Sequence, residues 1–121
     1  MEESNESTRS KSSQDIVRYS ALELIENTKA PATTDSDTYS FAMLILECIT
    51  EEIPFSNLPS YAGVIHARIS KRQTPPRPDG QNRISDDLWD LMIRCWSVTL
   101  HQRPTMEQVH THFLLIPDST Q

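Results

Sequence analysis

The side chains best able to do chemistry in this 121-residue sequence are four histidines, two cysteines and a group of carboxylates. His110 and His112 stand two residues apart, so on a helix they would point about 160° away from each other and could not share one metal ion. Asp86, Asp87 and Asp90 resemble a carboxylate cluster, but the solvated first turn of a helix also accounts for them. We therefore expect neither a metal site nor a catalytic carboxylate pair.

The two cysteines, Cys48 and Cys95, each lie within an apolar stretch. The N-terminus has no basic and then apolar segment that would route the chain to an oxidising compartment. We expect two reduced thiols in the hydrophobic core and a cytoplasmic or nuclear location, with a disulfide or a reactive thiol as the less favoured alternative.

Glycine content and charge exclude several kinds of binding. Gly63 and Gly80 are the only glycines, and neither belongs to a glycine-rich loop of the kind that cradles phosphate. The chain has 17 acidic and 11 basic residues and a formal net charge of -6, the wrong sign for a nucleic-acid-binding surface. No apolar run approaches the roughly 18–20 residues that cross a bilayer. We expect neither a nucleic-acid nor a membrane partner.

The elements that must position these side chains are helices, because no segment alternates apolar and polar residues as a strand does. Residues 1–15 are almost wholly polar and rich in serine, which predicts a disordered tail. The apolar run over residues 35–49 predicts a helix enclosed on most sides, with residues 35–37 supplying its cap.

Four further helices are predicted from apolar residues at helical spacing. They lie near residues 16–26, after a cap at Ser60, after a cap at Ser85, and after a capping box formed by Thr105 and Gln108. Polar or proline-containing loops separate these segments. The chain is therefore predicted to be all-α with about five helices, as one domain over residues 16–116 between tails at 1–15 and 117–121.

Four short segments stand in a particular order along the chain. They are Arg18-Tyr19-Ser20-Ala21-Leu22-Glu23, Asp37-Thr38-Tyr39-Ser40-Phe41-Ala42, Cys95-Trp96 and Arg103-Pro104-Thr105-Met106. Together they resemble the back half of a protein kinase domain, most closely that of the tyrosine-kinase-like group of serine/threonine kinases. Any one segment alone would be a weak signal. The resemblance, from about Ile16 to Leu115, implies the helical lower part of a kinase large lobe.

The resemblance also implies roles for particular residues. Glu23 takes the place of the glutamate of the family's Ala-Pro-Glu motif and would pair with Arg103, tying the first helix to the last through a shielded ion pair. Asp37 would stand at the start of the central helix and act there as a local cap. The family's substrate-docking strip would survive only as a vestige, at Arg18, Tyr19 and Ser20.

The parts with which the family binds ATP and Mg²⁺ have no counterpart in this sequence. They are the glycine-rich loop, the Val-Ala-Ile-Lys strand, the His-Arg-Asp loop and the Asp-Phe-Gly metal site. We therefore expect no cofactor and no catalytic residue in this chain, and a non-catalytic remnant or protein-binding module. The alternative is a fragment of an active serine/threonine kinase whose N-terminal part lies outside this chain.

Truncation would also affect the central helix. In the family it is covered by helices and a catalytic loop that have no counterpart in this sequence. An apolar helix surface would then be exposed, and a protein partner or a second copy of the chain would cover it.

Overall fold

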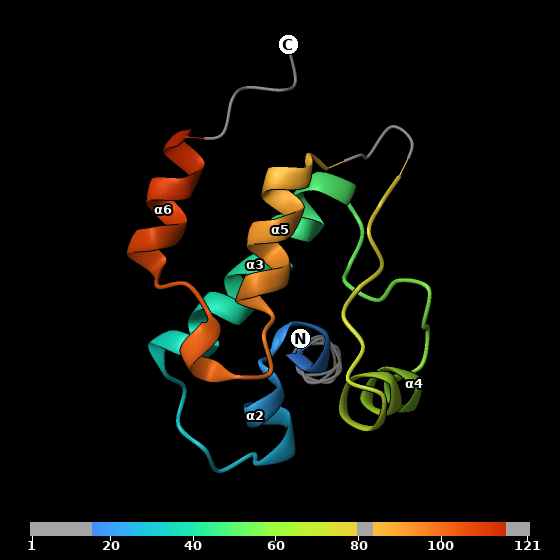
Figure 1. Cartoon of the computed structure of the whole chain (residues 1–121). Coiled ribbons are helices and arrows are strands. Elements are labelled where there is room, and N and C mark those ends of the chain that lie inside the picture. Colours follow the sequence, from blue (N-terminus) through green and yellow to red (C-terminus); the bar gives the residue numbers. More distant parts are fainter. Residues whose placement is uncertain (1–15, 80–83, 116–121) are drawn as a thin grey trace, which may run out of the picture.

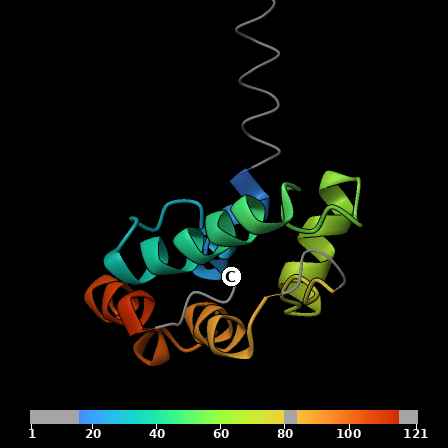
Figure 2. The same ribbon diagram turned by 90° about the horizontal axis from the view of Figure 1, so that it is seen from above.

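The computed structural model describes residues 16–79 and 84–115, and the regular structure in them is helical (Figures 1 and 2). No β-strand occurs in these two ranges, so the all-α prediction is confirmed. The predicted tails at residues 1–15 and 117–121 lie outside the described residues. After a helical turn at residues 16–19, the elements are α2 (Leu22–Glu26), α3 (Thr34–Thr50), α4 (Tyr61–Ile65), η1 (His66–Ser70), α5 (Asp86–Cys95), η3 (Leu100–Gln102) and α6 (Met106–Leu115).

Helix α3 runs across the molecule, and α5 and α6 lie on one side of it (Figure 2). Its N-cap is Thr33, whose hydroxyl accepts a hydrogen bond from the Ser36 N–H at 3.1 Å, while the Ser36 hydroxyl accepts one from the Thr33 N–H at 2.7 Å. The predicted cap at residues 35–37, including the local capping role of Asp37, was wrong. Asp35 and Asp37 lie in the first turn, where a negative charge is favourable near the positive helix end.

Only part of the α3 surface is enclosed. Leu44 is 50% exposed and Cys48, four residues later on the same face, is also exposed. The predictions that this helix is enclosed on most sides and that Cys48 is a core thiol were therefore wrong, whereas Cys95 is buried as predicted. The buried side chains of α3 are those of Ser36, Thr38, Tyr39, Ala42, Met43 and Leu46.

Helix α4 begins at the predicted cap, where the Ser60 hydroxyl accepts a hydrogen bond from the Gly63 N–H at 2.9 Å. A single helix was predicted here, but the chain passes into the π-helical turn η1, in which the Lys71 N–H reaches the His66 carbonyl oxygen at 3.2 Å. The turn carries Arg68 into the interior, where the residue is completely buried.

The two C-terminal helices begin as predicted. The Ser85 hydroxyl accepts a hydrogen bond from the Leu88 N–H at 3.2 Å. Thr105 and Gln108 form the capping box, with hydrogen bonds of 2.9 and 3.0 Å between each side chain and the other residue's N–H. The caps fix where each helix starts and hence which faces meet the core. Those faces bury Leu91, Met92 and Cys95 from α5 and Val109 from α6.

Candidate functional site

The ion pair between Glu23 and Arg103 joins α2 to the loop before α6. Arg103 Nη1 lies 2.8 Å from Glu23 Oε2, and Nη2 lies 2.9 Å from Oε1. Arg103 Nε donates to the Ser97 carbonyl oxygen at 2.8 Å, and Nη1 also donates to that of Asp35 at 3.1 Å. The structure thus brings together the two residues that the sequence predicts to pair, and each guanidinium nitrogen has an acceptor.

This pairing sets the charge state of the glutamate. Burial raises the pKa of the Glu23 carboxyl, but hydrogen bonds from Arg103 and from the Glu23 backbone N–H lower it, as do the charges of Arg103 and Arg68. The net effect is a pKa below the ordinary value, so the carboxylate is ionised at neutral pH. The arrangement holds two helical segments together and engages four of the five N–H groups of Arg103.

A second buried guanidinium lies close to this pair. Arg68 Nη1 donates to the Val17 carbonyl oxygen and Nη2 to the Tyr39 hydroxyl, both at 2.7 Å. Its central carbon lies 5.2 Å from the centroid of the Tyr39 ring and 5.6 Å from that of Phe55. Arg103 lies 4.8 Å from the same Tyr39 centroid, so one buried phenol is close to two cations.

Arg68 is unusual because its charge is fully enclosed. No ion pair of Arg68 occurs in residues 16–79 and 84–115, and its Nε has no hydrogen-bond partner there. Burial accordingly lowers the pKa of the guanidinium, although Tyr39 and Glu23 act in the opposite direction. This network was not predicted from the sequence. The available signal was that Arg68 follows Val64 by four residues, which places it on the apolar face of the predicted helix.

The predicted docking strip is tied to the protein's own backbone. Arg18 Nη1 donates to the carbonyl oxygens of Pro54 and Phe55 at 3.0 and 2.8 Å, and Nη2 donates to that of Leu58 at 2.9 Å. Arg18 is 7% exposed. Its guanidinium therefore fixes the loop that follows α3 and is not presented to a peptide.

The rest of the strip contacts α3. The Tyr19 hydroxyl donates to Glu47 Oε1 at 2.5 Å, and the Ser40 hydroxyl donates to the Tyr19 carbonyl oxygen at 3.0 Å. Ser20 is half-buried, whereas Asp37 is exposed in the first turn of α3. Of the predicted site residues, Glu23 and Arg103 thus lie together, whereas Asp37 lies outside that ion pair.

The metal-ligating side chains are dispersed over residues 16–79 and 84–115. In this part of the chain no three histidine, cysteine, aspartate or glutamate side chains gather closely enough to hold a metal ion. Gly63, the described glycine, lies within α4 and belongs to no phosphate-binding loop. A Cβ at Gly63 would lie 2.9 Å from the Ser60 hydroxyl oxygen, so this glycine makes room for the helix cap.

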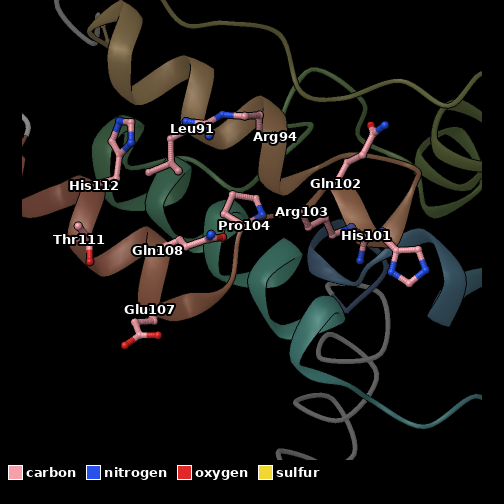
Figure 3. A pocket seen from close by; sticks show the side chains of 10 residues that line it. All are labelled: Leu91, Arg94, His101, Gln102, Arg103, Pro104, Glu107, Gln108, Thr111 and His112. Carbon is pink, nitrogen blue, oxygen red and sulfur yellow. The ribbon is translucent and has the colours of Figure 1, made fainter.

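Cavities on the described surface include the following two. One, of about 540 Å³, lies between α5, the η3 turn and α6 (Figure 3). The other, of about 180 Å³, lies between the end of α3, the loop after it and residues 75–79. The larger one is lined by Leu91, Arg94, His101, Gln102, Arg103, Pro104, Glu107, Gln108, Thr111 and His112.

Comparison with known proteins gives a consistent result. A family model described as protein tyrosine and serine/threonine kinase matches residues 1–113. The probable serine/threonine-protein kinase drkC of Dictyostelium discoideum is 31% identical over 91 residues, which are 75% of this chain and 11% of that protein. The human proto-oncogene tyrosine-protein kinase ROS is 33% identical over 84 residues, 69% of this chain and 3% of that protein.

A plant protein adds to this pattern. The serine/threonine-protein kinase VIK of Arabidopsis thaliana is 32% identical over 88 residues, which are 73% of this chain and 19% of that kinase. The chain therefore spans less than a fifth of the length of each of these three relatives.

Proposed function

Since the chain belongs to the family of protein tyrosine and serine/threonine kinases, we propose that it is a non-catalytic part of a kinase large lobe. The helical scaffold is present, and the Glu23–Arg103 pair locks α2 to the segment before α6. Phosphoryl transfer depends on groups that position ATP, bind Mg²⁺ and orient the acceptor hydroxyl. The observations that support the proposal are that the sequence has no glycine-rich loop and that no three metal-ligating side chains gather among the described residues.

We propose that this non-catalytic part of a kinase lobe contacts another protein. On α3 the exposed Leu44 and Cys48 form an apolar stripe along one face, which we name the α3 stripe. Burying apolar surface favours association, so the stripe supports binding to a protein partner or to a second copy of the chain. The formal charge of -6 disfavours nucleic acid, and none of the described helices is long and apolar enough to cross a membrane. We place this role in the cytoplasm or nucleus.

A second candidate function is that of a fragment of an active serine/threonine kinase. Two observations favour it: the chain spans only a small share of each relative, and Glu23, Asp37 and Arg103 are all retained. In that case residues outside this sequence would supply the nucleotide site. The two candidates differ in whether the 121-residue chain alone has any affinity for ATP.

Calorimetric titration with ATP and Mg²⁺ tests the proposal. The purified chain is titrated after circular dichroism has shown that the same sample is helical, and an active kinase domain serves as the positive control. No heat of binding from a folded sample is the expected result. Micromolar affinity would overturn the proposal, because it would require a nucleotide site in this chain.

The association surface has its own test. Light scattering of the chain at high concentration is expected to show self-association that Leu44→Glu abolishes. Val98→Glu is the matched control, because Val98 is also 50% exposed but lies outside the α3 stripe. A monodisperse monomer would rule out binding to a second copy of the chain. Equal effects of the two variants would rule out the α3 stripe as the contact surface.

A further inference from the structure

We propose that the cavity between α5 and α6 binds a short acidic peptide segment of a partner protein. In this arrangement an aliphatic side chain of the peptide would contact the floor of the cavity, and carboxylates on either side would meet its basic rim. The proposal concerns a different surface from the α3 stripe, and it does not depend on whether the chain is catalytic.

The cavity has the size and floor of a binding site. Its volume of about 540 Å³ lies within the range of about 300–1,000 Å³ that is usual for ligand pockets. The floor contains Leu91 and Pro104, both buried by the surrounding protein. Because these two residues expose little surface, an aliphatic side chain in contact with them would mainly remove its own apolar surface from water.

The charge of the lining contrasts with that of the chain. Two of the 11 lysines and arginines and two of the four histidines line the cavity, against one of the 17 acidic residues. That residue, Glu107, points away from Arg94 and His112 (Figure 3). Since Glu23 neutralises Arg103, Arg94 is the positive charge of this lining that an anionic ligand would meet.

Arg94 is the cation available to such a ligand. Arg103 also lines the cavity, but Glu23 and two carbonyl oxygens already occupy four of its five N–H donors. Arg94 is exposed, and no hydrogen bond or ion pair of its side chain occurs in the described part of the chain. A guanidinium in this state can form a bidentate, charge-assisted pair with a carboxylate.

Helix α6 supplies donors on the opposite wall. Gln108 Oε1 accepts the capping hydrogen bond from the Thr105 N–H, which orients the amide and leaves its NH₂ group as a donor. Thr111 and His112 follow Gln108 by three and four residues, so all three lie on one face of α6. In Figure 3 Gln108 and Thr111 lie below Leu91 and Arg94, whereas His112 lies beside Leu91. Donors from two helices therefore converge on one space.

Fluorescence anisotropy with the full chain tests this inference. The probe is a fluorescein-labelled peptide Asp-Glu-Leu-Glu-Asp, titrated at constant ionic strength. We expect saturable binding that Arg94→Gln weakens about tenfold, because a charge-assisted hydrogen bond is lost. Thr111→Glu, which introduces a carboxylate from the other wall, is expected to weaken binding similarly. Circular dichroism of each variant checks that it is folded.

Matched controls separate the cavity from general electrostatics. Arg72→Gln removes an exposed arginine elsewhere and is expected to leave the affinity unchanged. The amide peptide Asn-Gln-Leu-Gln-Asn should not bind, and Asp-Glu-Ser-Glu-Asp should bind more weakly than the leucine peptide because it lacks the aliphatic contact.

Four outcomes would overturn the inference. They are no saturable binding of the acidic peptide, an equal loss with Arg72→Gln, equal affinity for the serine peptide with displacement by inorganic phosphate, and binding to phosphatidylserine vesicles in place of the peptide. The third would indicate an anion site only, and the fourth a membrane surface. None of these four outcomes bears on ATP affinity. Either proposal can therefore fail without the other.

Discussion

Glu23 and Arg103 are 80 residues apart in the sequence, yet two N–O contacts of 2.8 and 2.9 Å join them. The Arg103 side chain is completely shielded and that of Glu23 is 25% exposed. Arg103→Ala would leave Glu23 with a partly buried charge and leave two carbonyl acceptors without their donor. We expect this variant to lower the free energy of unfolding by about 3–5 kcal/mol, as measured by urea denaturation.

The exposed ion pair between Arg72 and Glu26 provides the comparison. Its side chains are 45% and 39% exposed at an N–O distance of 3.0 Å. Solvent screens such a pair, so Arg72→Ala should cost at most about 1 kcal/mol in the same assay. Similar losses in the free energy of unfolding for the two alanine variants would show that the Glu23–Arg103 pair stabilises the fold no more than an exposed ion pair does.

Protonation of Glu23 should destabilise the fold in acid. Its pKa in the folded state lies below the value in the unfolded chain, so the unfolded state binds the proton more readily. The stabilisation is fully present above the unfolded pKa and is lost as the pH falls through the folded pKa. Thermal unfolding between pH 7 and pH 3 should show this loss.

The Glu23→Gln variant serves as the control for the acid transition. It has no titrating carboxyl at this position, so its stability at neutral pH should already be low and should fall less in acid. An identical pH dependence in the variant and the natural chain would assign the acid transition to other carboxylates.

The hydrogen bond between Arg68 and Tyr39 should contribute to the stability of the fold. Tyr39→Phe preserves the ring but leaves Arg68 Nη2 without its acceptor inside the protein. We expect a loss of about 1–3 kcal/mol in the free energy of unfolding. In an Arg68→Met background the same change should cost less than about 1 kcal/mol, because no donor is then left unsatisfied. Additive effects in the double variant would contradict this coupling.

Features that depend on neighbouring residues were predicted well from the sequence. The caps at Ser60, Ser85 and Thr105 need only a side-chain oxygen within three residues of a backbone N–H, so the local sequence contains the required information. The start of α3 was missed because Thr33, Asp35 and Ser36 are all acceptable capping residues. Propensity alone does not choose among them.

Features that depend on distant residues were not predicted from local sequence patterns. The burial of Arg68 requires the Val17 carbonyl and the Tyr39 hydroxyl, 51 and 29 residues away. Likewise, an apolar run does not show which face of its helix other segments cover, and so Cys48 was placed in the core. The Glu23–Arg103 pairing came from a family resemblance and not from helical periodicity, because no local pattern relates residues so far apart.

The two thiols should differ sharply in reactivity, because one lies at the surface and the other in the core. Cys48 is exposed, whereas burial raises the pKa of the Cys95 thiol to about 11, against the smaller opposing effects of Arg94 and Arg103. The thiolate is the reactive form, so at pH 7.5 Cys95 is both shielded and protonated. We expect iodoacetamide to label Cys48 rapidly and Cys95 only when the protein unfolds.

Variants identify which thiol gives each labelling phase. Cys48→Ser should remove the fast phase and Cys95→Ser the slow one. If the slow phase reports opening of the core, Arg103→Ala should accelerate it, since loss of the Glu23 pairing raises the population of the open state. An unchanged slow rate in a destabilised Arg103→Ala protein would mean that Cys95 becomes accessible through a local opening that the ion pair does not restrain.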